Sequence, residues 1–229
     1  HIELRKGGAG TLVLTGTNSY TGGTTIDMGT LQLGNGGQTG SITGNVVDNG
    51  SLVFNRSDDV TFKGYIVGSG TVEKAGKGSL ILTGDSLYRG GTLISNGILQ
   101  IGDGGVGGSI IGDVLNNGSL VFDRSADPAQ SGIFNGTISG SGSLVQNGTD
   151  KVSLVADNTY SGGTTINSGT LQIGHYGATG SIVGDVTNNG SLEFSRGDDT
   201  SFTGIISGNG MLVKTGEGKL TLTGFQTYT

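Results

Sequence analysis

The 229-residue chain contains no cysteine and no tryptophan, and it has only one proline and two histidines. The absence of cysteine excludes disulfide bonds, thiolate nucleophiles and thiolate metal ligands. No apolar run approaches the roughly 20 residues that a membrane-spanning helix requires. Hydrophobic residues make up 32% of the chain while glycine occurs 49 times, a composition that is common in disordered segments. Composition alone therefore leaves two alternatives open, a disordered chain or a fold with many regular turns.

Charge is sparse and of mixed sign. Lysine and arginine number 12, aspartate and glutamate number 18, and the formal net charge is -6. The chain has no basic stripe, which disfavours nucleic acid as a partner and also simple electrostatic binding to anionic membranes. We expect no nucleic-acid partner and no direct insertion of this chain into a membrane.

The residues that usually carry catalysis are nearly missing. His1 and His175 are the only histidines, and the acidic residues are spread along the chain. The pairs Asp58-Asp59 and Asp198-Asp199 supply the oxygen ligands that calcium prefers. The nine-residue calcium-binding repeat is absent, however, so solvated turn residues are the simpler interpretation. We predict that the chain is not an enzyme and that it holds no cofactor and no metal.

What the chain does have is a long internal repeat. Tyr20, Tyr88, Tyr160 and Tyr228 follow similar apolar segments, at separations of 68, 72 and 68 residues. Apolar positions keep the same register from one repeat to the next, which argues against disorder. The period divides the chain into repeats at about 10–77, 78–149 and 150–217, with a fourth begun at 218–229.

Each repeat is made of short segments that alternate apolar and polar residues, separated by Gly, Asn, Asp and Ser. Segments such as Leu12–Leu14, Leu31–Leu33 and Leu52–Phe54 are typical of short strands, and none has the spacing of an amphipathic helix. Strands this short each point about two side chains inward, which is too few to bury a core alone. They form a continuous core when successive coils stack, with neighbouring strands about 4.8 Å apart. We predict an all-β fold, a right-handed parallel β-helix or β-solenoid of about ten rungs, with three strands per rung and three rungs per repeat. It spans residues 1–229 as a single domain.

The predicted core consists of apolar residues that recur at one phase in all three repeats. They are Ile26, Ile94 and Ile166; Leu31, Leu99 and Leu171; Ile42, Ile110 and Ile182; Leu52, Leu120 and Leu192; Phe54, Phe122 and Phe194; and Phe62, Phe134 and Phe202.

One longer motif within the repeat points to a family. The segment Gly10–Gly34 reads GTLVLTGTNSYTGGTTIDMGTLQLG; it recurs at Gly78–Gly102 and Asp150–Gly174 and begins again at Gly218. It resembles the passenger-associated strand repeat of bacterial autotransporters, the type V secreted proteins. The resemblance implies an extracellular passenger β-helix at the bacterial cell surface. In the full-length protein it would be anchored at the outer membrane through a C-terminal translocator barrel. A chain without disulfides suits passage through a narrow pore.

Family members are commonly adhesins, autoaggregation factors or biofilm proteins, and some act in virulence. The resemblance therefore implies a structural stalk that also serves adhesion, with other passengers, a host-surface protein or a glycan as partners. Polar residues expected on the outer strand faces, such as Thr25, Gln32, Gln100 and Gln172, offer hydrogen bonds to such partners. The alternative is a transport and folding scaffold without its own ligand, which supports an enzyme or toxin domain elsewhere.

Candidate binding residues lie where the repeats differ, because loops carry variation and function together. Asp127, Pro128 and Gln130 lie in the segment that makes the second repeat longer than the first. His175 and Tyr176 form an unusual turn in the third repeat.

A further candidate is the tripeptide Arg196-Gly197-Asp198, which some host-cell ligands use to engage integrins. The same phase in the other repeats reads Arg56-Ser57-Asp58 and Arg124-Ser125-Ala126. The simpler interpretation is a basic residue that leaves a strand and enters an acidic turn.

Overall fold

The computed structural model describes residues 2–127 and 132–228, and these residues form short strands and turns without any helix. Accordingly, no helix in the described part of the chain is long and apolar enough to cross a membrane. The chain divides into two compact units. Unit 1 comprises His1–Asp103 and Gly107–Ser119, and unit 2 comprises Gly104–Val106 and Leu120–Thr229. The predicted single domain and its repeat boundaries stay predictions.

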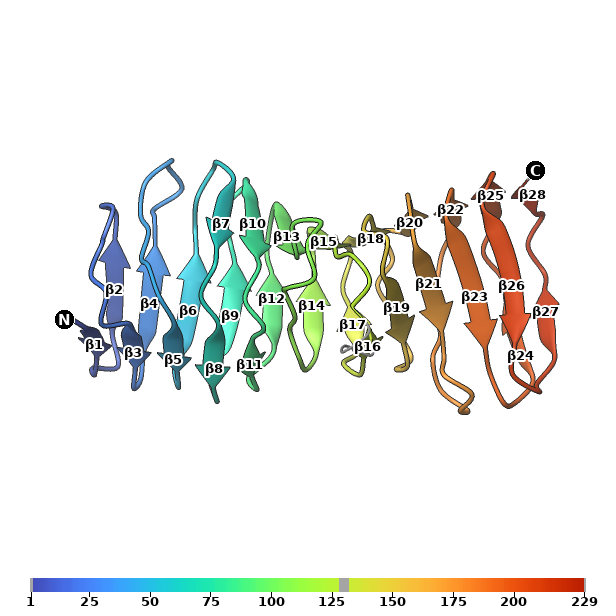
Figure 1. The fold of residues 1–229 in the computed structure, drawn as a ribbon, viewed down its shortest axis with the longest axis horizontal. Helices are drawn as coiled ribbons and strands as arrows, with labels where there is room; N and C mark the ends of the chain where they lie inside the picture. The colour runs from blue at the N-terminus through green and yellow to red at the C-terminus, as the bar shows by residue number, and fades with distance from the viewer. Residues whose placement is uncertain (1, 128–131, 229) are drawn as a thin grey trace. The chain divides into compact units, whose positions relative to one another are not determined.

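The strands of unit 1 are β1 (Leu4–Lys6), β2 (Thr11–Leu14), β3 (Thr24–Ile26), β4 (Thr30–Leu33), β5 (Val46–Asp48), β6 (Ser51–Phe54), β7 (Val60–Phe62), β8 (Ile66–Gly68), β9 (Thr71–Lys74), β10 (Ser79–Leu82), β11 (Leu87–Tyr88), β12 (Thr92–Ile94), β13 (Ile98–Ile101) and β14 (Val114–Asn116). They form three parallel sheets, with the orders β1-β3-β5-β8-β11, β2-β4-β6-β9-β12-β14 and β7-β10-β13. Each sheet collects strands that are far apart in sequence, as successive coils of a solenoid require (Figure 1).

The remaining strands are β15 (Ser119–Phe122), which starts on the last residue of unit 1, β16 (Ile133–Phe134), β17 (Ile138–Ser139), β18 (Ser143–Gln146), β19 (Lys151–Leu154), β20 (Thr164–Ile166), β21 (Thr170–Ile173), β22 (Val186–Asn188), β23 (Ser191–Ser195), β24 (Thr200–Phe202), β25 (Ile206–Gly208), β26 (Met211–Thr215), β27 (Leu220–Leu222) and β28 (Thr227–Tyr228). Unit 2 is also built of parallel sheets, with the orders β16-β19-β21-β23-β26, β18-β20-β22-β25-β28 and β24-β27. The predicted all-β solenoid of stacked coils is confirmed, with about 11 turns counted over both units.

The repeat does not contain a whole number of coils. In unit 1, Leu12 pairs with Leu31, Leu31 with Leu52, and Leu52 with Val72, so three coils run from position 12 to position 72. Leu80, the repeat equivalent of Leu12, lies in β10 on the next sheet. In unit 2, β19 and its equivalent β27 likewise belong to different sheets. The expectation of three whole rungs per repeat is therefore corrected to three coils plus one strand, so equivalent residues change face from repeat to repeat.

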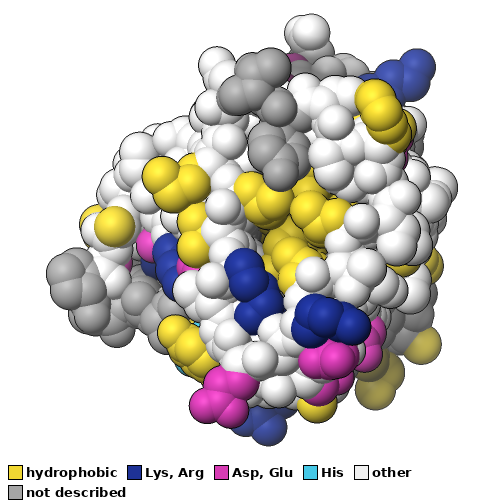
Figure 2. Space-filling view, turned by 90° about the vertical axis from the view of Figure 1, so that its right-hand side faces the viewer, with side chains coloured by type: hydrophobic (Ala, Val, Ile, Leu, Met, Phe, Trp, Pro, Cys, Tyr) yellow, Lys and Arg dark blue, Asp and Glu magenta, His cyan; other side chains and the backbone are white. Residues whose placement is uncertain are grey.

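The core consists of the residues that the recurrence predicts. All 18 are buried, and none is more than 6% exposed. Phe54 and Phe62, on the consecutive strands β6 and β7 of unit 1, meet edge to face with ring centroids 5.6 Å apart. Apolar side chains gather in the middle of the C-terminal face of unit 2, with charged groups around them (Figure 2). Burial of these apolar core side chains is the main source of the stability of the fold.

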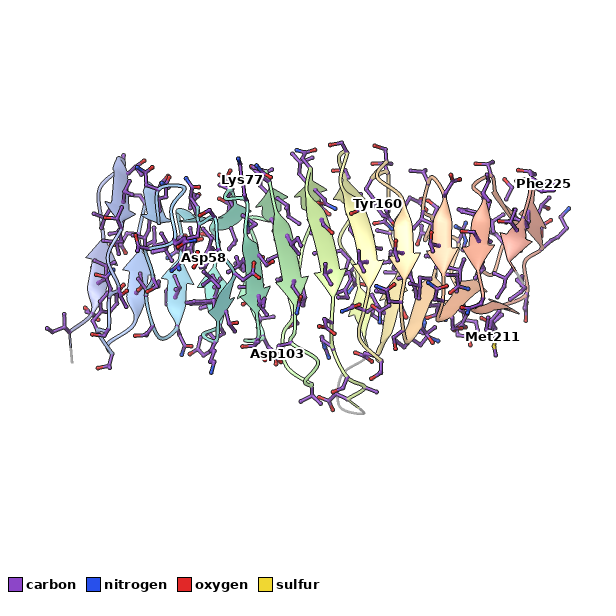
Figure 3. The ribbon with its side chains drawn as sticks, turned by 90° about the horizontal axis from the view of Figure 1, so that it is seen from above. Asp58, Lys77, Asp103, Tyr160, Met211 and Phe225 are labelled. Carbon is purple, nitrogen blue, oxygen red and sulfur yellow. The ribbon has the colours of Figure 1, made fainter. Side chains whose placement is uncertain are left out.

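The tyrosine and the threonine of the repeat motif are explained by a hydrogen bond between their side chains. Tyr88 and Tyr160 are fully buried, and their hydroxyls share hydrogen bonds of 2.7 and 2.8 Å with Thr92 and Thr164, four residues further on. The threonine after each Gly-Gly pair therefore satisfies a phenol that would otherwise be buried without a partner. Exposed large apolar side chains are scattered over both units, and in unit 2 Met211 and Phe225 extend away from the ribbon (Figure 3).

Candidate binding site on the outer surface of unit 2

The turn after β21 holds an exposed aromatic residue in an unusual backbone conformation. Tyr176 has a φ of 59°, and it is the only residue other than glycine with a positive φ in the described part of the chain. At the same phase, Gly36 and Gly104 have φ values of 79° and 84°. An L-residue there costs about 1 kcal/mol relative to glycine. Tyr176 is nevertheless 62% exposed, so burial does not offset that cost.

His175 accompanies Tyr176 on the same turn. The two rings meet edge to face, with centroids 5.4 Å apart and planes at 65°. Nδ1 of His175 lies 3.4 Å from Oε1 of Gln172 on β21. The turn therefore presents a pair of exposed rings whose base is tied to the strand that precedes it.

The structure brings this turn beside the Arg196-Gly197-Asp198 segment, which follows β23 in the next coil. The backbone N–H of Tyr176 donates to the carbonyl of Ser195, and the N–H of Gly197 donates to the carbonyl of Gly177, both at 2.9 Å. A Cβ on Gly197 would lie 2.7 Å from the carbonyl oxygen of Tyr176, so the two turns approach each other closely at this glycine. Two of the predicted candidate sites thus form one surface.

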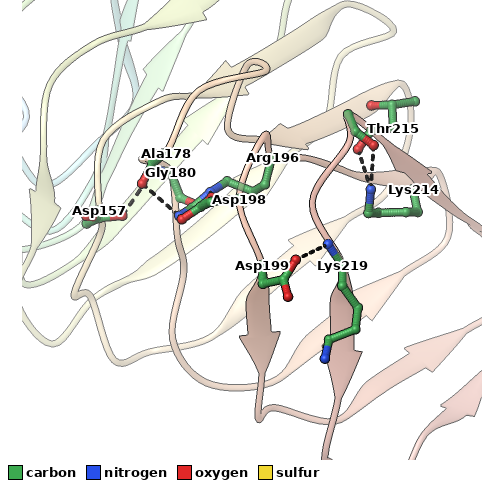
Figure 4. A network of polar contacts seen from close by, with 10 residues as sticks. Asp157, Ala178, Gly180, Arg196, Asp198, Asp199, Lys214, Thr215 and Lys219 are labelled. Atoms are coloured by element: carbon green, nitrogen blue, oxygen red, sulfur yellow. Dashed lines mark hydrogen bonds and ion pairs between the residues drawn. The ribbon is translucent and has the colours of Figure 1, made fainter.

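The guanidinium of Arg196 faces into the fold rather than toward solvent (Figure 4). It donates to the carbonyls of Gly180 and Ala178, each at 2.7 Å, and forms two hydrogen bonds with the Asp198 carboxylate at 2.8 and 2.9 Å. These hydrogen bonds from Arg196 hold the pKa of the Asp198 carboxyl below its ordinary value. Arg196 therefore clamps the turn that carries Tyr176. Its use by an external receptor stays a prediction.

Equivalent arginines make similar contacts in the other repeats. In unit 1, Arg56 donates to the carbonyls of Gly40 and Gln38 and pairs with Asp58 in the same way. In the second repeat Ala126 replaces the acid, and Arg124 pairs instead with Asp150, whose carboxylate lies 3.6 Å away. Asp150 stands at a phase that is glycine in the other repeats, so the acid has moved while the ion pair is retained.

Beneath the His175–Tyr176 turn, outward-facing polar side chains form a connected network on β19, β21, β23 and β26. Glu193 accepts hydrogen bonds from Gln172 at 3.0 Å, from Thr215 at 2.7 Å and from Lys151 at 2.8 Å. Ser153 donates to Gln172 at 2.6 Å. Burial raises the pKa of the Glu193 carboxyl, but the bonds from Lys151, Thr215 and Gln172 outweigh burial, and the pKa lies below its ordinary value.

This network is specific to the third repeat. Glu193 stands where the first repeat has Val53, and Ser153 stands where it has Val13. Gln32, the equivalent of Gln172, donates to the carbonyl of Gly34 in its own turn at 2.8 Å. The His175 patch is the set of third-repeat residues that differ or are rearranged here: Lys151, Ser153, Gln172, His175, Tyr176, Glu193 and Thr215.

The network also corrects one expectation. The sequence predicts an accessible outer-face position for Gln172, but the residue is only 1% exposed, and its side chain is hydrogen-bonded to Ser153 and Glu193 at the paired positions of the two neighbouring strands. Strand alternation correctly places Gln172 on the outer side of its sheet. Alternation carries no information about what covers that side.

The other candidates lie elsewhere or outside the described residues. Asp127 is half-buried in the segment between β15 and β16. Pro128 and Gln130 lie outside the described residues. Within residues 2–127 and 132–228, no group of three or more His, Cys, Asp or Glu side chains is placed to hold a metal ion.

Comparison with known proteins relates the sequence of this chain to a family. The model of the Passenger-associated-transport-repeat matches residues 4–33, 72–101, 144–173 and 212–229. A protein named "Adhesin BmaC autotransporter", from Brucella suis biovar 1 (strain 1330), is 36% identical over 194 residues, which cover 76% of this chain and 6% of that protein. The chain therefore spans only a small part of that relative's length. No solved structure matches it. The chain is a stretch of autotransporter passenger and belongs to the family that carries the passenger-associated transport repeat.

Proposed function

We propose that this chain is a surface-displayed passenger segment that acts as a stalk and contributes directly to adhesion. The observation that carries the proposal is its 36% identity to a protein named an adhesin, across most of the chain. The fold is compatible with this role, because stacked coils make a rigid scaffold on which variable turns are presented to the outside. The passenger repeats favour a location at the bacterial cell surface, tied to the outer membrane.

Cell attachment tests this proposal. The chain is displayed on a non-aggregating bacterial host, and attachment to host-cell monolayers and settling of the cultures are compared with a host that displays an unrelated β-solenoid at equal density. We expect increased attachment, increased settling through self-association, or both. Equal attachment and equal settling would contradict an adhesive role.

A transport and folding scaffold is the second candidate, and the family name favours it. The residues shared by all repeats are buried core positions and turn glycines, which serve folding rather than recognition. Under this function, deletion of residues 78–149 from the full-length protein lowers export while the exported molecules keep their adhesion. Unchanged export after the deletion would count against the scaffold function.

A further inference from the structure

We propose that the His175 patch is a carbohydrate-binding site, in which a neutral sugar ring stacks on Tyr176 beside His175. The inference rests on the proposed adhesive function and names the ligand class for one surface of unit 2. The shared features of the repeat do not explain this surface, because its residues are the ones that depart from the repeat.

The backbone of Tyr176 is strained at a position where glycine would not be. Two other repeats place glycine at this phase, where φ is positive at no steric cost. The tyrosine ring makes no buried contact that offsets the strain, since the residue is 62% exposed. Residues held in sparsely populated conformations without a packing reason cluster at binding and functional sites. The strain therefore points to a role for the exposed ring itself.

The chemistry around the two rings suits a neutral sugar. Exposed aromatic faces bind the C–H faces of flat, amphipathic groups, and the phenol hydroxyl and imidazole supply hydrogen bonds at the edge. The nearby charges are already paired within the protein, Lys151 with Glu193 and Arg196 with Asp198. The surface therefore offers rings and hydrogen bonds without an uncompensated charge. This combination fits a neutral sugar better than an anionic glycan, a nucleic acid or an apolar peptide.

The turn that carries the rings is held in place by the protein. The Arg196 guanidinium holds the two carbonyls of the turn, and Gly197 packs against the carbonyl of Tyr176. Gln172 lies between His175 and the buried carboxylate of Glu193. A turn whose backbone is already held in place loses less conformational entropy when it binds, which raises the affinity of a small contact area.

The test is a glycan array probed with the purified chain. The array carries neutral oligosaccharides of hexoses and N-acetylhexosamines, with sialylated and sulfated glycans alongside. We expect the parent to be retained on neutral glycans and Tyr176→Gly to lose at least about tenfold of that affinity. Tyr176→Gly restores the residue of the other repeats and relieves the strain, so it is expected to fold at least as stably as the parent. Tyr65→Ala removes an exposed tyrosine of unit 1 and should bind like the parent.

The outcomes separate this proposal from the adhesive function. Equal glycan affinity of the parent and Tyr176→Gly overturns the site, and so does retention on sialylated or sulfated glycans alone. If cells attach through the chain but the purified chain binds no glycan on the array, the carbohydrate assignment is overturned. Adhesion would then depend on a protein partner. Glycan binding that depends on Tyr176, in a chain whose displaying cells neither attach nor settle, supports the site and overturns the adhesive role.

Discussion

The first and third repeats share a frame, which consists of the buried core residues and the arginine-held turns, but they differ on one outer surface. Both close the turn after the second strand of the motif with an arginine, Arg56 or Arg196, which binds two turn carbonyls and an aspartate. In the first repeat the turn is Asn35-Gly36 over Val53, whereas in the third it is His175-Tyr176 over Glu193. The comparison separates the residues that build the solenoid from the residues that vary on its outer surface. The following predictions test that separation.

The largest effect is expected in the shared core. Leu52→Ala and Leu192→Ala remove fully buried side chains at the same phase. Each should lower the free energy of unfolding by about 3 kcal/mol, through lost burial and the cavity left behind. Chemical denaturation of the two variants measures it. A loss below about 1 kcal/mol for either would place that residue outside the core and break the equivalence of the repeats.

The arginine clamp should come next. Arg56→Ala and Arg196→Ala leave two turn carbonyls and one aspartate without their donor, and each should cost about 2 kcal/mol. Similar losses from both variants would show that the clamp serves the frame. If Arg196→Ala left the melting temperature unchanged while Arg56→Ala lowered it, Arg196 would belong to the variable surface instead.

A buried acid distinguishes the two repeats in their response to pH. Asp48 is fully buried where the third repeat has Asn188, and burial raises the pKa of its carboxyl from 3.8 to about 6. The native state therefore binds more protons than the unfolded state between these two values, so the free energy of unfolding falls as the pH rises through this range. Asp48→Asn should remove this dependence and stabilise the protein at pH 7.5 by about 1–2 kcal/mol.

Melting temperatures of the parent and Asp48→Asn between pH 4 and pH 7.5 measure the effect. Asn188→Asp is the matched reverse change and should introduce the same dependence in unit 2. Parallel pH profiles for the parent and Asp48→Asn would show that Asp48 titrates normally.

The smallest effect is expected within the His175 patch. Glu193→Val installs the residue of the first repeat. The side chain of its ion-pair partner Lys151 is 46% exposed and can return to water, so the change should cost less than about 1 kcal/mol. Gln172 should then donate to the carbonyl of Gly174, as Gln32 does to Gly34. A crystal structure of the variant shows the new bond. A loss of several kcal/mol would mean that the network is part of the frame.

The sequence was sufficient to predict the frame because stacking repeats the same environment at each phase. Recurrence at one phase identified buried residues such as Ile26, Leu120 and Phe202 without any structure. It did not reveal that a repeat ends one strand beyond three coils, because coil length varies with the turns. It also missed the burial of Gln172 and the role of Glu193, since both depend on side chains that cross between coils. The His175–Tyr176 turn was found because it departs from its counterparts, and the strain at Tyr176 needed the backbone.

A single exchange variant tests the central claim most directly. Lys151→Thr, Ser153→Val, His175→Asn, Tyr176→Gly, Glu193→Val and Thr215→Ala together convert the His175 patch of the third repeat into the equivalent surface of the first. Attachment of cells that display this variant is compared with that of cells displaying the parent at equal density. The account predicts a folded, exported variant with most of the attachment lost. Undiminished attachment by a folded variant would contradict the claim that adhesion resides where the repeats differ.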